Sequence, residues 1–324
     1  MKQRQAENSE GRDPRYESAA AKSLKLGDYE IHQAWEGFAS IRQVSSGEIM
    51  HSRTAPMEEA RRIYVDQAHL AERLGGANNT DALVLWDVGL GAGANAMAAI
   101  TCYEEVAGRG RVRPLHLISF ENDLDSFRLA ADHPTQFPYL NHEAAAVLLT
   151  QRDWRSARFP ALKWSLVLGD FTETMSGALG LPDLIFYDMF SSRSASEPWS
   201  YRTFRRLFEH CGRHDVELFT YTCSTANRAA LLAAGFWLAR GRNAGPKIET
   251  TIALSPSAAT NRTRSPREIL SIEWLQKWNR STAKFPHDID SSARPAFEKL
   301  IREHEQFRNS GVPERLSSTT QNSR

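Results

Sequence analysis

A glycine-rich loop between a predicted strand and a predicted helix is the part of the chain best suited to ligand chemistry. It reads Asp87-Val88-Gly89-Leu90-Gly91-Ala92-Gly93-Ala94-Asn95. Glycine lets the backbone turn sharply and lets a ligand approach without a Cβ atom in the way. The same spacing fits the dinucleotide fingerprint, because Ala94 can replace its third glycine. The loop therefore predicts a ligand site, with a purely structural turn as the alternative.

Acidic residues stand at the ends of the predicted strands. Asp87 lies two residues before the first glycine, and Glu121, Asp170 and Asp188 end the next three strands. Ligands of open α/β sheets bind outside the carboxyl ends of the strands. There, Glu121 can bind both hydroxyls of a ribose and Asp170 can accept from an adenine amino group. Four carboxylates suit a cationic sulfonium better than a pyrophosphate, so we predict S-adenosylmethionine as the cofactor. Each acid taken alone could instead be a helix cap or a surface charge.

Strand-like and helix-like segments alternate after residue 80, which is typical of a parallel sheet covered on both faces. The strand-like segments are residues 83–89, 115–121, 164–170, 183–190 and 216–222, and the helix-like ones lie near residues 95–107, 123–132, 142–151, 172–179, 199–211 and 225–234. Residues 235–242 and 246–254 follow too closely for a crossover helix, so they predict a terminal antiparallel hairpin. We expect an α/β fold with a mostly parallel, seven-stranded sheet of the class I methyltransferase (Rossmann-like) type.

The flanking segments predict smaller elements. Residues 28–54 alternate and carry turn residues, which indicates two or three short strands in a small N-terminal β extension. Residues 56–74 predict one helix that begins at Pro56. Residues 268–280 predict an amphipathic helix, and residues 296–307 predict the last one.

Composition limits the classes of partner and cofactor. The 324 residues carry a formal net charge of +1, so a nucleic-acid surface would have to be a local patch. Residues 240–284 hold nine Lys or Arg against three Glu, which indicates either such a patch or a solvated basic face. The three cysteines are widely spaced, and no metal-ligand pattern is present. Because neither a signal peptide nor a membrane span is visible, we predict a cytoplasmic protein.

Blocks across residues 45–285 resemble the methyltransferase part of the MnmC enzymes, which methylate 5-aminomethyl-uridine at the tRNA wobble position. The blocks are GEIMHSRTAPMEEARRIYVDQAHL, DVGLGAGANAMAAI, LHLISFENDLDSFRLA, LVLGDFTE, YDMFSSRSASEPWS, TYTCSTANRAALLAAGFWLARGRNAGPKIE and EWLQKWNRS. The resemblance implies an S-adenosylmethionine-dependent enzyme that N-methylates this wobble uridine, with tRNA as its partner. We expect a methyltransferase domain over residues 25–285, preceded by a polar, disordered tail over residues 1–24 and followed by a helical extension and polar tail over residues 286–324.

The resemblance and the strand-end acids together predict the site residues. Those expected to bind the cofactor are Asp87, Gly89, Gly91, Gly93, Asn95, Glu121, Gly169, Asp170 and Phe171. Those expected to bind the acceptor are Tyr64, Phe190, Pro198, Trp199 and Lys247, with His51 in the same blocks. Asp188 is the predicted catalytic residue, which holds the acceptor amine in line and takes its proton. Alternatives remain: Asp188 could contact only the cofactor, Phe190 and Trp199 could be core residues, and His51 could be structural.

The chain departs from the family pattern where the acceptor should bind. Met189-Phe190-Ser191-Ser192 replaces the usual Gly-Phe-Ala-Pro, and Glu197-Pro198-Trp199 follows one residue early. A methyltransferase acting on a small molecule or a protein, or a non-catalytic module, therefore stays possible. A nicotinamide-dependent oxidoreductase is less favoured, because Glu121 lies 32 residues after Gly89 instead of roughly 20. No second glycine fingerprint follows, so we expect no FAD.

Overall fold

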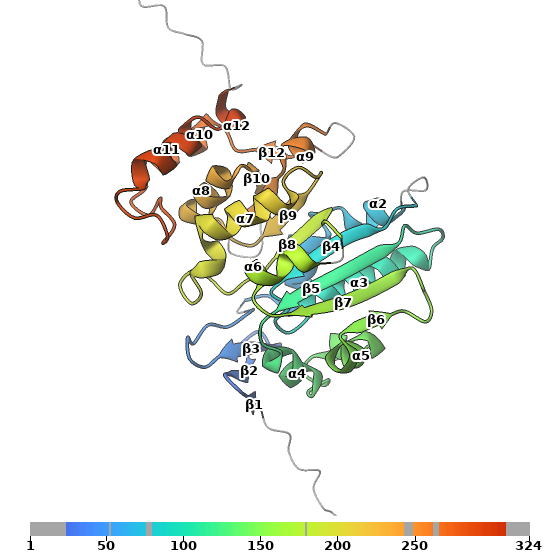
Figure 1. The fold of residues 1–324 in the computed structure, drawn as a ribbon. Helices are drawn as coiled ribbons and strands as arrows, with labels where there is room; N and C mark the ends of the chain where they lie inside the picture. Colours follow the sequence, from blue (N-terminus) through green and yellow to red (C-terminus); the bar gives the residue numbers. More distant parts are fainter. Residues whose placement is uncertain are drawn as a thin grey trace, which may run out of the picture.

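The main body is one large mixed sheet with helices on both faces (Figure 1). The computed structural model describes residues 24–51, 53–75, 80–178, 180–242, 249–261 and 266–308. Five strands run parallel in the order β9-β8-β4-β5-β7. Their bounds are β4 Leu83–Val88, β5 Leu115–Glu121, β7 Leu162–Leu168, β8 Leu184–Tyr187 and β9 Glu217–Thr220. The predicted parallel set is confirmed.

The terminal hairpin closes one side of the sheet. Its strands, β10 (Trp237–Gly241) and β11 (Thr250–Leu254), are antiparallel, and β11 lies between β9 and β10. Two short antiparallel strands, β6 (Asp153–Arg155) and β12 (Glu268–Ile269), extend the edges to nine strands. The seven expected strands are thus present, with one unpredicted strand added at each edge.

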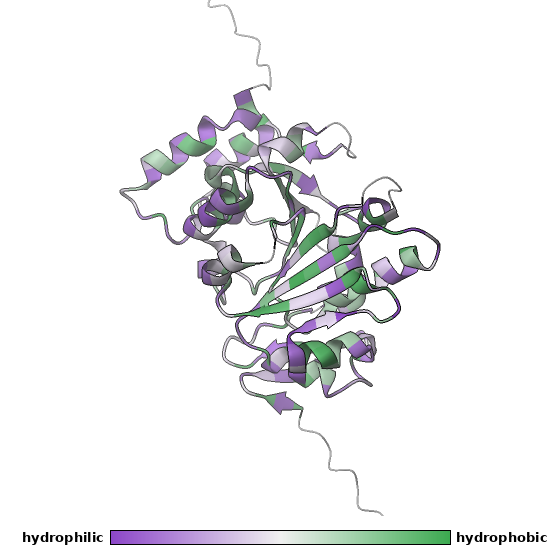
Figure 2. Ribbon diagram, turned by 45° about the vertical axis from the view of Figure 1, so that its right-hand side comes forward, coloured by the Kyte–Doolittle hydropathy of each residue, from purple (hydrophilic) through white to green (hydrophobic). Residues whose placement is uncertain are grey.

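Side chains of the parallel strands alternate between two hydrophobic cores, as the pleat of a sheet requires. In β4, Leu83 and Leu85 point into one core, whereas Trp86 and Val88 point into the other. In Figure 2 the apolar colour concentrates on the central strands, while the outer helices carry both colours. Burial on both faces explains why these strands appear in the sequence as nearly continuous apolar runs.

Helices cover each face. The first core is covered by α1 (Pro56–Ala60), α2 (Leu70–Gly75), α3 (Ala94–Ala107), α4 (Asp125–Ala131) and α5 (Glu143–Gln151). The second is covered by α6 (Phe171–Thr174), α7 (Tyr201–Cys211), α8 (Thr225–Ala234), α10 (Ile272–Arg280), α11 (Arg294–Arg302) and α12 (Glu305–Arg308). Short helix α9 (Pro256–Thr260) follows β11, and 3₁₀ turns occupy Pro138–Leu140, Met175–Gly177 and Glu197–Trp199. Among the described residues, no helix is long and apolar enough to cross a membrane.

The N-terminal extension is a separate three-stranded antiparallel sheet. It consists of β1 (Lys25–Leu26), β2 (Tyr29–Gln33) and β3 (Ala39–Gln43). Figure 1 shows it in blue beside α4, with which it makes contacts. The predicted disordered tail lies outside the described residues, apart from residue 24. This small sheet places the segment after β3 against the carboxyl edge of the main sheet.

Several predicted helices differ from the structure; residues 296–307, for example, are divided between α11 and α12. Residues 56–74 do not form one helix, because a π-helical turn, η1 (Arg61–Val65), follows α1. The Asp66 amide donates to the Arg61 carbonyl at 2.8 Å, and His69 then adopts a φ of 50°, which ends the helical path before α2. At the other end of the chain, Glu268 pairs with β10 as a strand, and α10 begins only after the Ser271 cap.

Candidate active site

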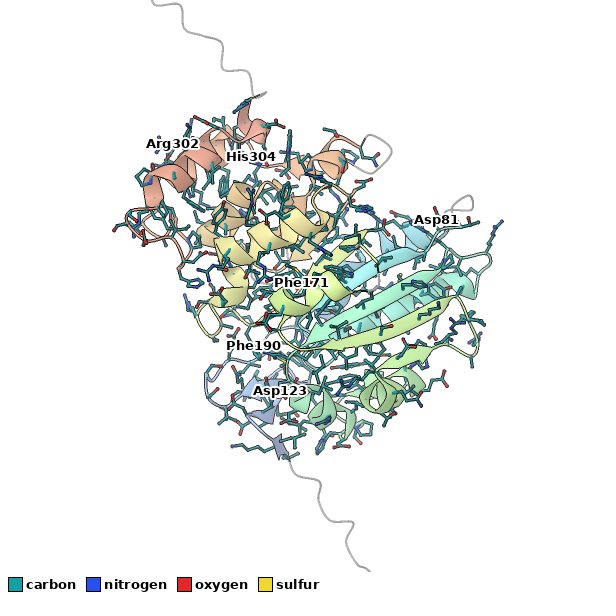
Figure 3. All side chains as sticks on the ribbon, in the orientation of Figure 1. Asp81, Asp123, Phe171, Phe190, Arg302 and His304 are labelled. Carbon is teal, nitrogen blue, oxygen red and sulfur yellow. The ribbon has the colours of Figure 1, made fainter. Side chains whose placement is uncertain are left out.

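A cavity of about 1260 Å³ lies where β4, β5, β7 and β8 end. This is the edge, next to the change in strand order around β4, at which open α/β sheets bind ligands. The glycine loop and strand ends form its floor, and residues 46–51, 53–54, 189–191 and 193–195 form further walls. Figure 3 labels Phe190 and Asp123 near the border between the main sheet and the N-terminal sheet, and Phe171 above them on α6. The volume exceeds the roughly 300–1,000 Å³ of a usual ligand pocket, so it can hold two ligands.

The three glycines of the loop have two different roles. Gly89 and Gly91 line the cavity with φ values of 90° and 54°, which favour glycine. A Cβ atom at Gly89 would lie 2.7 Å from the carbonyl oxygen of Asp188. Gly93 does not line the cavity; a Cβ atom there would lie 2.6 Å from a ring carbon of Phe127. Gly93 therefore serves the packing of α3.

The structure brings three of the four predicted acids to the cavity. Glu121 accepts hydrogen bonds from the backbone N–H groups of Gly91, Asn122 and Asp123, at 3.0, 2.8 and 3.3 Å. Burial nevertheless raises the pKa of Glu121. Asp170 is exposed and caps α6, with Thr172 N at 2.7 Å from its carboxylate. The neighbours of Asp170 in the sequence, Gly169 and Phe171, also line the cavity.

Asp87, the fourth acid, lies beneath the loop and does not line the cavity. The hydroxyl of Ser119 on β5 donates to its Oδ2 at 2.7 Å, which holds the carboxyl inside the protein. Burial raises the pKa of Asp87 to about 8, and the charges of Asp188 and Glu121 add to the increase. The expectation of a direct cofactor contact thus lacks support for this residue.

Asp188 is half-buried and lies in a polar cluster with buried Asn95 and His51. The amide of Asn95 donates to its Oδ2 at 2.7 Å. Burial raises the pKa of Asp188, although the charge of His51 acts in the opposite direction. His51 lines the cavity, with Nδ1 3.4 Å from Oε2 of Glu59. Burial lowers the pKa of His51, but the hydrogen bond and charge of Glu59 outweigh it and raise the pKa.

The predicted acceptor residues are divided. Phe190 and Pro198 line the cavity, whereas Tyr64 and Trp199 do not. Trp199 is 1% exposed, and its indole N–H donates to the Phe190 carbonyl at 2.7 Å, so it supports the cavity wall from the core. Tyr64 is buried on η1, where burial and the charge of Asp188 raise its pKa. Lys247 lies outside the described residues.

Sequence reasoning missed several residues of the cavity wall. Glu48 follows β3 and accepts from the backbone N–H and the hydroxyl of Ser191, at 2.8 and 2.9 Å. This contact joins the N-terminal segment to the loop after β8. Glu59, Arg53 and Arg193 also line the cavity. The departure from the usual Gly-Phe-Ala-Pro was visible in the sequence, but the partner of Ser191, 143 residues away, was not.

Part of the basic segment at residues 240–284 is neutralised by ion pairs. Arg240 pairs with Glu249 at 2.9 Å and with Glu268 at 3.2 Å. Arg267 pairs with buried Glu217 at 2.8 Å. Three further cations, at positions 247, 262 and 264, lie outside the described residues. Within the described ranges, no group of His, Cys, Asp or Glu side chains could hold a metal ion.

The residues present fit S-adenosylmethionine. Two buried acceptor atoms, Asp87 Oδ1 and Asn95 Oδ1, have no donor among the described side chains and backbone groups. Asn95 lines the cavity, so its free oxygen can receive a donor from a ligand. Gly89 and Gly91 leave room for close approach, and the surrounding carboxylates favour a ligand with positive charge.

Comparisons with known proteins agree with this geometry. Residues 137–256 match a family model described as S-adenosyl-L-methionine-dependent methyltransferase. The chain is 26% identical over 231 residues to the tRNA 5-methylaminomethyl-2-thiouridine biosynthesis bifunctional protein MnmC of Pseudomonas aeruginosa, covering 69% of this chain and 35% of that protein. The protein of the same name from Aeromonas salmonicida is 27% identical over 216 residues, covering 62% and 32%. The chain thus spans about a third of the length of these relatives.

A solved structure shows the same fold. The crystal structure of MnmC2 from Aquifex aeolicus superposes with a TM-score of 0.60, at 20% identity, and covers 86% of this chain and 85% of that one. It confirms the class I methyltransferase fold expected from the strand pattern. The description of the family model names S-adenosyl-L-methionine as the cofactor. Residues 137–256 therefore match the S-adenosyl-L-methionine-dependent methyltransferases, and the chain is similar to about a third of the length of the MnmC proteins.

Proposed function

We propose that this methyltransferase N-methylates the 5-aminomethyl group of the wobble uridine in tRNA. The observation that carries the proposal is the acidic cluster around Asp188, which suits an acceptor that enters as an ammonium ion. The names of the relatives point to the same class of acceptor. We also propose a cytoplasmic location, because tRNA is the proposed acceptor.

In the proposed complex, the floor of the cavity holds the cofactor. Gly89 and Gly91 allow close backbone approach, Glu121 accepts from ribose hydroxyls, and Asp170 accepts from the adenine amino group. Bound S-adenosylmethionine supplies a methyl group that is already activated by the sulfonium. The protein therefore has mainly to align the acceptor and exclude water.

Asp188 is the proposed catalytic residue. Its carboxylate holds the acceptor ammonium in line and accepts a proton, because only the neutral amine is nucleophilic. Asn95 fixes the orientation of this carboxylate through the 2.7 Å hydrogen bond. Phe190 and Pro198 line the adjoining wall, where the base of the acceptor would lie.

The test uses labelled cofactor and bulk tRNA from cells that lack this methylation. We expect label in tRNA, and nuclease digestion should recover it in a 5-methylaminomethyl-uridine derivative. Calorimetric titration with S-adenosylmethionine and NAD in parallel should show binding of the first alone. Label that enters protein or small molecules but not tRNA would overturn the proposed acceptor, a result that the altered Met189–Ser192 loop makes worth measuring.

A further inference from the structure

We infer that Arg53 and Arg193 form a subsite at the cavity wall that binds the RNA phosphates flanking the acceptor nucleotide. The inference rests on the proposed function and specifies how its substrate is held. Both side chains are exposed, and both line the cavity. Within the described ranges, neither guanidinium has a hydrogen bond or an ion pair to another residue.

The Glu48–Ser191 contact joins the two segments of the wall that carry the arginines. Arg53 follows Glu48 by five residues, and Arg193 follows Ser191 by two. The two hydrogen bonds of 2.8 and 2.9 Å join these segments directly. Two residues span at most about 7 Å, so Arg193 stays close to this junction.

Charge is separated between the inner and outer parts of the cavity. The carboxylates of Glu59, Glu121 and Asp188 are half-buried, whereas Arg53 and Arg193 are exposed. Glu197, an exposed acid of the same wall, lies 3.3 Å from His287. A ligand with a cationic amine inside and anionic groups outside matches this arrangement, and an aminomethylated nucleotide within RNA has both features.

None of the described cations of the basic segment at residues 240–284 lines the cavity, and its Arg240 and Arg267 are already paired with carboxylates. Unpaired guanidinium groups bind phosphate better than groups already paired with carboxylates, since they are free to form bidentate hydrogen bonds with it. The subsite therefore also favours RNA over a neutral small-molecule acceptor.

The experiment measures binding and methylation of tRNA by the wild type, R53Q, R193Q and the double variant, over a series of salt concentrations. Each substitution should raise the Kd for tRNA about five- to tenfold and reduce the slope of log K against log salt by about one. Affinity for S-adenosylmethionine should stay unchanged. The matched controls are R109Q and R111Q, exposed residues after α3, whose 14 residues extend about 20 Å from the glycine loop.

The outcomes separate this inference from the proposed function. If the wild type methylates tRNA and the double variant keeps its affinity and salt slope, the subsite is wrong and the function stands. If the wild type binds tRNA through the arginines but does not methylate it, the acceptor is wrong and the subsite stands. A wild type that neither binds nor methylates tRNA overturns both.

Discussion

At the scale of single residues, Asp188 offers the most direct test of the chemistry. Asp188→Asn keeps an oxygen that can accept from Asn95 but removes the negative charge and the proton acceptor. We expect turnover to fall about 10²- to 10⁴-fold, while the Kd for S-adenosylmethionine changes only a few-fold. Steady-state kinetics and calorimetry measure the two effects. Asp153→Asn, on the edge strand β6, is the control, and unchanged turnover in Asp188→Asn would remove Asp188 from the reaction.

Asp87 should make stability depend on pH. Its pKa is about 8 in the folded protein, against an ordinary value of 3.8 for an aspartate side chain, so the folded state keeps a proton that the unfolded state loses. Stability should therefore fall as the pH rises from about 4 to about 8, and level off above that. Asp87→Asn cannot ionise, so its melting temperature should lose this slope and exceed that of the wild type at pH 8.5 by at least ~2 °C. Parallel slopes for the two proteins would contradict the buried neutral carboxyl.

At the scale of elements, the turn into α3 depends on Gly93. Gly93→Ala places a Cβ atom 2.6 Å from Phe127 at a φ of 78°, so both a clash and backbone strain result. We expect a loss of about 2–3 kcal/mol in unfolding free energy, measured by denaturant titration. Gly47→Ala separates the two causes, because Gly47 has a φ of 71° and nothing within 4 Å of its added Cβ atom. Equal losses in the two variants would show that packing against Phe127 contributes nothing.

Regular elements were largely predictable, because burial on two faces and helical periodicity leave local patterns. The strands β4 and β5 and helix α8 fall within a residue or so of their expected bounds. The π-helical turn η1 was not predictable, because distant contacts accompany it. Gln67, just beyond the turn, hydrogen-bonds the Ile63 carbonyl and the hydroxyl of Thr250, 183 residues away. The short strand β12 depends in the same way on pairing with β10.

The candidate site was predictable only in part, for a related reason. Residues that belong to the strand ends, such as Glu121 and Asp188, follow from the topology of the sheet. The side-chain direction of Trp199 does not follow from the topology, because an aromatic residue after a proline can face either the cavity or the core. The core position is observed, where Trp199 packs 5.3 Å from Tyr187 between ring centres.

At the scale of the whole molecule, a buried ion cluster joins distant parts of the chain. Glu217 on β9 is 1% exposed and binds Arg73 of α2 as well as Arg267, which precedes β12. Glu217→Gln leaves two arginines without their charge partner, so we expect a loss of about 3 kcal/mol in unfolding free energy. Glu209→Gln breaks the exposed pair with Arg205 and should cost less than ~0.5 kcal/mol. Similar melting temperatures for the two variants would show that the cluster is not a stabilising link.

The N-terminal sheet also carries a natural optical probe. Trp35, between β2 and β3, is 100% exposed, whereas Trp86, Trp164, Trp199 and Trp278 are all at most 1% exposed. Acrylamide or iodide should therefore quench the emission of Trp35 first and leave the emission of the buried indoles. Fluorescence of the unlabelled protein can thus report contacts at this tip separately from changes in the interior.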